Sequence, residues 1–262
     1  MHRSLKILLC SAALFGLLGF GVLASAQEAG PFHFGFKKSK NGELPSIAQE
    51  GFMGILRKHQ AVFLGDTGKK ELYLTFDNGY ENGYTKKILD VLKEKKVPAA
   101  FFVTGHFIRD QPELVKRMVN DGHVVGNHSW SHPDLSQVSA SRIQEELEKV
   151  RQGVADLTGR QEMKYLRPPR GIFSDRMLQV SRTLGYTGVF WSVAYRDWEI
   201  NRQKGMQYAY GSVMGQLHPG AVILLHSVSA DNAAALGKII DDARRQGYVF
   251  NSLDQMQLKT YR

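Results

Sequence analysis

The 262-residue sequence holds a single cysteine, Cys10, which lies inside an apolar stretch near the N-terminus. One cysteine forms no disulfide within the chain, so stability has to come from a packed core. The sequence also lacks internal repeats, low-complexity runs and a glycine-rich phosphate loop after its first predicted strand. These absences exclude a disulfide scaffold and a repeat protein, and they give nucleotide binding little support.

The first 26 residues have the layout of a secretory signal peptide. Residues 1–6 are basic, residues 7–23 are apolar, and Ala-Ser-Ala at 24–26 is a small-residue cleavage site. We expect cleavage after Ala26 and export of the remainder. Cys10 would leave with the peptide, which excludes thiol catalysis in the mature protein. A retained membrane anchor is the alternative, because residues 7–23 are close to the shortest stretch that spans a bilayer.

The mature chain would be large and basic. Removal of 26 residues from 262 leaves 236, enough for one domain with a substantial core. The formal charge falls from +9 to +7 because only Arg3 and Lys6 are lost. A basic exported protein suits an anionic partner such as a cell-wall polymer or a membrane surface. Nucleic acid is the competing partner, but the cations are scattered and no nucleic-acid motif is present. We expect a monomer without an organic cofactor.

From residue 71 onward, short apolar runs alternate with amphipathic stretches. The runs predict strands at 72–76, 99–103, 124–127, 165–167, 188–193, 221–225 and 248–253. The stretches predict helices at 84–95, 112–121, 140–157, 175–184, 208–217 and 232–246. This order indicates an α/β fold, a distorted (β/α) barrel of seven or eight strands. A doubly wound open sheet is the alternative, but its functional residues would gather at one switch point.

Residues 27–70 are expected to form an N-terminal extension that packs on a main domain of residues 71–262. Phe32, Phe34 and Phe36 alternate with His33 and Gly35, which predicts a short strand or an extended apolar segment. A helix is predicted over residues 46–59 after a turn at Asn-Gly, positions 41–42. We expect this extension to pack without carrying chemistry.

Acidic, basic and histidine residues stand where the predicted strands end. Asp77 follows the first strand, His128 and His132 follow the third, Arg167 ends the fourth and leads to Arg170, and His226 follows the run 221–225. In a parallel barrel such positions meet at one rim, so these six residues are expected to form one site.

Each of these residues also has a simpler interpretation. Asp77 precedes Asn-Gly and could serve a turn or a helix cap, yet an acid beside an arginine stays ionised and can act as a general base. Two histidines four residues apart are often structural, but on a helical turn they share one face and can share a metal. His226 is either a core residue whose hydrogen bonds are satisfied or the general acid that protonates a leaving amine.

The segment after Arg167 is Pro-Pro-Arg-Gly, a stiff turn. Because prolines have no N–H, an amide that meets developing negative charge there has to come from Arg170 or Gly171. Further along, Asp197 could orient Arg167 or His226, and Trp198 could form an apolar wall. A loop carboxylate and a packing indole are the simpler interpretations of that pair.

Taken together, five segments resemble the ordered motifs of the polysaccharide deacetylases, carbohydrate esterase family 4, over about residues 70–255. They are Thr75-Phe-Asp-Asn78, His128-Ser-Trp-Ser-His132, Arg167-Pro-Pro-Arg-Gly171, Asp197-Trp198 and Leu224-Leu-His226. Five motifs in order are far more specific than any one alone. The longer strings at 75–83 and 198–205 resemble the branch that deacetylates N-acetylmuramic acid during muramic δ-lactam formation in the spore cortex.

The resemblance implies a role for each matching residue. Asp77 would be the general base and His226 the general acid, with His128 and His132 as metal ligands. Arg167 would position Asp77, and Asp197 would hold Arg167 or the acid. Three residues would contact the acetyl group: Trp198 and Leu224 along its methyl, and Arg170 through its backbone N–H in the oxyanion hole.

The implied reaction is hydrolysis of the N-acetyl amide of peptide-free N-acetylmuramic acid in a peptidoglycan strand. It would follow an N-acetylmuramoyl-L-alanine amidase and take place in the cell wall or the forespore cortex. One alternative keeps the chemistry but acts on N-acetylglucosamine in peptidoglycan or chitin. Another is a non-catalytic glycan-binding barrel, which would need neither Asp77 nor His226.

Two positions depart from the family pattern. Asn78 stands where an acid is usual, and an amide is the weaker ligand, so zinc or a similar cation would be held loosely. Arg170 stands where an aromatic residue is common. Because arginine recognises carboxylates in a bidentate manner, we expect its guanidinium to meet the lactyl carboxylate of muramic acid.

Overall fold

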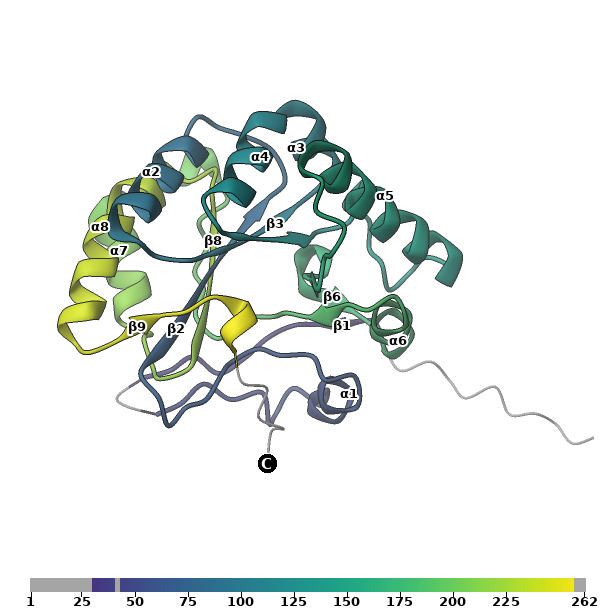
Figure 1. Cartoon of the computed structure of the whole chain (residues 1–262). Helices are drawn as coiled ribbons and strands as arrows, with labels where there is room; N and C mark the ends of the chain where they lie inside the picture. Colours follow the sequence, from purple (N-terminus) through teal and green to yellow (C-terminus); the bar gives the residue numbers. More distant parts are fainter. Residues whose placement is uncertain (1–29, 41–42, 257–262) are drawn as a thin grey trace, which may run out of the picture.

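The computed structural model describes residues 30–40 and 43–256, so the predicted signal peptide at 1–26 lies outside the described residues. A seven-stranded parallel sheet curls through the centre of the molecule (Figure 1). Six strands follow one another across it: β7 (Thr187–Gly188), β5 (Tyr165–Leu166), β4 (Val124–Asn127), β3 (Ala100–Val103), β2 (Glu71–Asn78) and β8 (Ala221–His226). The seventh, β9 (Val249–Phe250), pairs with the start of β2. The predicted (β/α) barrel class is confirmed.

Among the described residues, no full strand lies between β7 and β8. Residues 188–193 were expected to form one strand, but the ladder stops at Gly188 and continues only as single bridges from Val189 to Val62 and from Val193 to Ile223. The carbonyls of Val189 and Phe190 instead accept hydrogen bonds from a buried arginine side chain. That side chain takes the acceptors that a neighbouring strand would use, so the prediction of a continuous strand was wrong.

Helices lie outside the curled sheet (Figure 1). Six match predicted helices within a few residues: α2 (Thr85–Lys95), α4 (Pro112–Asn120), α5 (Ala140–Thr158), α6 (Asp175–Thr183), α7 (Met206–Met214) and α8 (Ala230–Arg245). Serine side chains cap three of them, at Ser139, Ser174 and Ser229. Within the described part of the chain, no helix is both long and apolar enough to cross a membrane.

One short helix, α3 (Gly105–Asp110), was not predicted. It starts at Gly105, a poor helix former, and the Thr104 side chain caps it. The glycine is required by packing, because a Cβ at this position would lie 2.2 Å from the ring of Trp130. Packing against Trp130 therefore places a glycine at the start of α3, although glycine has a low helix propensity.

The extension packs on the barrel through aromatic side chains. β1 (Phe32–His33) pairs antiparallel with β6 (Ile172–Phe173), and the ring of Phe34 stacks on Phe190 at 4.5 Å. The predicted helix over 46–59 is reduced to α1 (Met53–Lys58), because Gly51 adopts a left-handed φ of 77° just before it. A Lys58–Asp175 ion pair ties α1 to α6.

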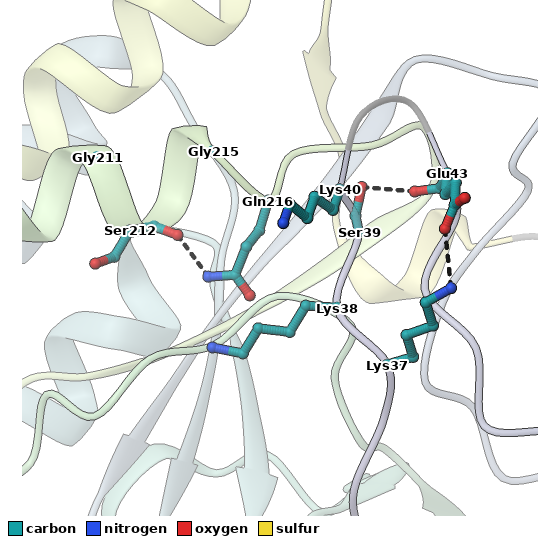
Figure 2. A pocket seen from close by; sticks show the side chains of 9 residues that line it. All are labelled: Lys37, Lys38, Ser39, Lys40, Glu43, Gly211, Ser212, Gly215 and Gln216. Carbon is teal, nitrogen blue, oxygen red and sulfur yellow. Dashed lines mark hydrogen bonds and ion pairs between the residues drawn. The ribbon is translucent and has the colours of Figure 1, made fainter. Parts of the chain in front are cut away.

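A cleft of about 650 Å³ separates the extension from α7, and Figure 2 shows its walls. Lys37 pairs with Glu43 across 2.9 Å, and the Lys38 ammonium donates to the Ala194 carbonyl at 3.1 Å. The Gln216 amide donates to the Ser212 carbonyl of α7. Of these three contacts, the Lys38–Ala194 hydrogen bond is the one that joins the extension to the main domain.

Candidate active site

The carboxyl ends of the strands surround a cavity of about 1040 Å³. Eight predicted site residues line it: Asp77, His128, His132, Arg170, Gly171, Trp198, Leu224 and His226. Three others, Asn78, Arg167 and Asp197, are buried behind this wall, with at most 2% of each residue exposed. The strand-end positions that were predicted to meet at one rim do meet there.

Asp77 is held by a fully buried arginine. The Arg167 guanidinium donates a hydrogen bond to Asp77 Oδ1 at 2.8 Å. It also donates to the Val189 and Phe190 carbonyls, and it lies 4.3 Å over the Phe102 ring. Burial is the largest single influence and would raise the pKa of Asp77. The charge and hydrogen bond of Arg167, together with His128 and His226, outweigh it, so the pKa falls below its ordinary value. The carboxylate therefore stays ionised, as a general base requires.

His226 is held by a second buried carboxylate. Its Nδ1–H donates to Asp197 Oδ1 at 2.7 Å, and its backbone N–H donates to Oδ2 at 2.8 Å. Asn232 adds a third hydrogen bond to Oδ2 at 2.6 Å. Of the two partners considered for Asp197, the structure shows His226. Burial lowers the pKa of His226, yet the Asp197 and Asp77 carboxylates together outweigh it and raise the pKa overall. A raised pKa favours the doubly protonated imidazole, whose Nε2–H is the proton available to the cavity.

His128 and His132 present their rings to the same cavity, 4.9 Å apart between centroids. The helical turn expected for this pair is absent, because Ser129 and His132 have left-handed φ angles of 64° and 57°. His128 Nδ1–H donates to the Arg167 carbonyl at 2.8 Å, which leaves the Nε2 lone pair free, 3.5 Å from Asp77 Oδ2. Burial lowers the pKa of both histidines, that of His132 to about 4, so both are neutral.

Neutral imidazoles can ligate a metal, and the backbone acceptor on Nδ1 of His128 leaves its Nε2 free to do so. The polysaccharide deacetylases that the sequence resembles generally depend on a metal. The third expected ligand, Asn78, does not face the cavity; its oxygen accepts from Ser227 at 3.1 Å and its amide nitrogen points to Thr85. No group of three or more His, Cys, Asp or Glu side chains in residues 30–40 and 43–256 is arranged to hold a metal. The donors that fit a cation are thus the two imidazoles, and a role for Asn78 stays a prediction.

The turn after β5 supplies one free amide. Arg170 and Gly171 both have left-handed φ angles, 57° and 67°. The Gly171 N–H donates to the Pro168 carbonyl at 3.0 Å, whereas the Arg170 N–H has no acceptor among the described residues. A Cβ at Gly171 would lie 2.7 Å from the Trp191 ring, so the turn needs glycine there. Of the two candidate oxyanion donors, Arg170 is the one that remains available.

The apolar wall comes from two predicted residues on the His226 side. Leu224 is 6% exposed, and Trp198 is 47% exposed with its ring 5.5 Å from that of His226. Sequence reasoning missed other lining residues: Tyr80, His106, Arg109, Trp130 and Trp191. Tyr80 and Trp130 lie inside motif strings and could have been found there. His106 and Arg109 lie on α3, which no sequence signal predicted.

Comparison with known proteins agrees with this geometry. The profile of the polysaccharide deacetylase family matches residues 64–189. The peptidoglycan-N-acetylmuramic acid deacetylase PdaA of Bacillus subtilis is 50% identical over 251 residues, which cover 96% of this chain and 95% of the relative. A chitooligosaccharide deacetylase of Sinorhizobium fredii is 35% identical over 202 residues, 72% of this chain and 93% of the relative.

The fold agrees as well. The structure of B. subtilis PdaA, a family 4 carbohydrate esterase, superposes with a TM-score of 0.84 at 53% sequence identity. The superposition covers 86% of this chain and 96% of that structure. The motifs, the rim geometry and these matches all agree, and the chain belongs to the polysaccharide deacetylase family.

Proposed function

We propose that this enzyme hydrolyses the N-acetyl amide of N-acetylmuramic acid residues in peptidoglycan whose stem peptides have been removed. The observation that carries the proposal is Arg170, an exposed cation at the cavity with no acidic partner among the described residues. A peptide-free muramic residue offers the complementary group, a lactyl carboxylate beside the acetamido group. The B. subtilis relative at 50% identity is named a peptidoglycan-N-acetylmuramic acid deacetylase.

The residues at the cavity supply each proton transfer. Asp77 takes a proton from water, and the water oxygen attacks the acetyl carbonyl carbon. The Arg170 N–H meets the charge on the tetrahedral oxygen. His226 then donates its Nε2 proton to the amide nitrogen, the C–N bond breaks, and acetate and a free amine leave. Arg167 keeps Asp77 ionised, and Asp197 keeps His226 protonated and aimed at the cavity.

A divalent cation on His128 and His132 would polarise the carbonyl and the attacking water. With a neutral amide at position 78 in place of an acid, such a cation would be held loosely. The remaining donors on it would come from water and substrate.

The deacetylated product can react further. The freed amine lies near the lactyl carboxyl of the same sugar, and closure with loss of water gives a muramic δ-lactam. Because that lactam belongs to the spore cortex, the proposed role is in cortex formation, after an amidase, with export directed by residues 1–26. The formal charge of +7 that remains when Arg3 and Lys6 are lost from +9 suits work on an anionic wall.

N-acetylglucosamine is the competing substrate, favoured by the 35% identity to a chitooligosaccharide deacetylase. The two substrates are distinguished by an Arg170→Tyr variant assayed on peptide-free and peptide-bearing peptidoglycan. Loss of an arginine–carboxylate contact should lower kcat/KM on peptide-free muramic residues at least about tenfold. Arg202→Tyr, which removes an exposed arginine that pairs with Glu199, is the control. An unchanged preference in Arg170→Tyr would defeat the lactyl contact.

A further inference from the structure

A second unpaired arginine faces the cavity from α3. The Arg109 guanidinium lies 4.9 Å over the Trp130 ring, and both side chains line the same cavity as Asp77 and His226. In the part of the chain that the structure describes, no carboxylate or carbonyl accepts a hydrogen bond from Arg109. Its donors are therefore available to a ligand in the cavity.

The aromatic support beneath this cation is fixed. A Cβ at Gly105 would lie 2.2 Å from the Trp130 ring, and one at Gly153 would lie 3.3 Å away. The Trp130 carbonyl accepts from the Gly105 N–H at 3.0 Å. A guanidinium that already lies against an immobile indole loses less conformational entropy when it binds a ligand. Arg109 is therefore preorganised to bind a planar anion.

The two free arginines flank the histidine loop. In the sheet, β4 lies between β5 and β3, so the loop with His128 and His132 separates the turn that carries Arg170 from the helix that carries Arg109. The Asp77 carboxylate does not neutralise either cation, because Arg167 already pairs with it. The open cavity therefore offers two cationic positions, one on each side of the reaction centre.

We propose that Arg109 forms a second carboxylate subsite, which binds the lactyl carboxylate of the neighbouring muramic acid on the same glycan strand. The inference rests on the proposed function, in which Arg170 meets the lactyl group of the reacting sugar. A peptide-free strand carries such a carboxylate on every second sugar. At about 1040 Å³, the cavity is at the upper end of the usual range for small-molecule sites and has room for more than one sugar.

The consequence is a preference for strands on which consecutive muramic residues have both lost their peptides. The test compares kcat/KM on three peptidoglycan tetrasaccharides that differ only at the neighbouring muramic residue. That residue carries a free lactyl carboxylate, its neutral methyl ester, or an intact stem peptide. The wild-type enzyme should act about fivefold faster on the free carboxylate than on the other two.

Arg109→Met should abolish this difference, and Arg109→Lys should restore part of it. Arg196→Met is the matched control, because Arg196 also lies over a tryptophan, Trp198, but already pairs with Glu199 at 3.1 Å. It should leave the ratio between the three substrates unchanged. Thermal unfolding of each variant is measured to check that the fold is retained.

Three results would overturn the subsite. Arg109→Met could keep the wild-type ratio, the peptide-bearing neighbour could match the free carboxylate, or the variant could lose equal activity on all three substrates. A wild-type enzyme that deacetylates no muramic residue in any of them would instead refute the proposed function itself. The two failures are thus distinct.

Discussion

Asp77 and His226 are register partners on the adjacent parallel strands β2 and β8. Paired residues of neighbouring strands point to the same face, so the sheet ladder itself sets the candidate base beside the candidate acid. Each is then anchored from behind by a buried group of opposite charge, Arg167 for the carboxylate and Asp197 for the imidazole. The backbone fixes the spacing, and the two buried ion pairs fix the protonation states.

The first prediction concerns the Asp197→Asn variant. In the native enzyme the Asp197 carboxylate raises the pKa of His226, so activity that needs protonated His226 is lost only as pH rises past this raised value. With a neutral amide at position 197, the Asp77 carboxylate is left to oppose the burial penalty, so the pKa of His226 falls and the alkaline limb of kcat/KM should move to lower pH. The acid limb, set by the lowered pKa of Asp77, should change little.

Glu199→Gln is the control for this profile, because Glu199 pairs with Arg196 and Arg202 instead of His226. Its alkaline limb should stay in place. An Asp197→Asn profile that overlays the native one would show that Asp197 does not set the protonation of His226.

The second prediction concerns stability. Arg167→Met leaves the Asp77 carboxylate buried without its cation, which should cost about 3–5 kcal/mol in the free energy of unfolding. Adding Asp77→Asn removes the buried charge and should recover part of that loss. Urea unfolding of the single and double variants measures both effects. A loss below about 1 kcal/mol in Arg167→Met would mean that the carboxylate finds other compensation.

The same pair predicts a pH dependence of stability in the native protein. The pKa of Asp77 is lower in the folded state, so its contribution is present above the unfolded value of about 4. It is lost as pH falls through the lowered folded value. Asp77→Asn should flatten the acid side of the stability curve, and an unaltered curve would argue against the shift.

A third prediction concerns metal binding. Because the Asn78 oxygen already accepts from Ser227, we expect Asn78→Ala to keep the zinc affinity within about twofold. His128→Ala and His132→Ala should each abolish binding, since each removes one of two imidazole donors. Calorimetric titration with zinc distinguishes these outcomes. A large loss in Asn78→Ala would make Asn78 a ligand after all.

A fourth prediction concerns the histidine loop. The buried Glu146 carboxylate of α5 accepts from the Ser131 N–H at 2.7 Å, from the Ser131 hydroxyl at 2.6 Å, and from Arg142 at 2.6 Å. Glu146→Ala should free the loop that carries His132 and weaken zinc binding more than Glu146→Gln, which keeps an acceptor oxygen. Glu145→Ala, at the exposed neighbouring position, is the control. Equal zinc affinity in all three variants would refute this coupling.

Much of the barrel could be predicted from local sequence signals. The alternation of apolar runs with amphipathic stretches predicted six of the helices and most strands of the sheet. The departures arise from long-range contacts. Arg167 diverts the Val189 and Phe190 carbonyls from strand pairing, and Trp130 imposes a glycine on the start of α3.

The site shows the same division. Asp77, His128 and His226 could be placed at one rim because strand ends meet there in any parallel barrel. The sequence left open whether Asp197 serves Arg167 or His226, since that depends on where a long loop returns. Arg109 could not be found at all, because only the three-dimensional packing of α3 brings it into the cavity.

Deacetylation of peptide-free muramic acid by Asp77 can be measured in a single experiment. Peptidoglycan, with and without prior amidase treatment, is digested with the mature enzyme, and the muropeptides are weighed by mass spectrometry. We expect loss of acetyl, or of acetyl plus water, only on peptide-free muramic residues, and none with the Asp77→Asn variant. Loss of acetyl from glucosamine residues, or equal loss on peptide-bearing muramic residues, would contradict the proposed function.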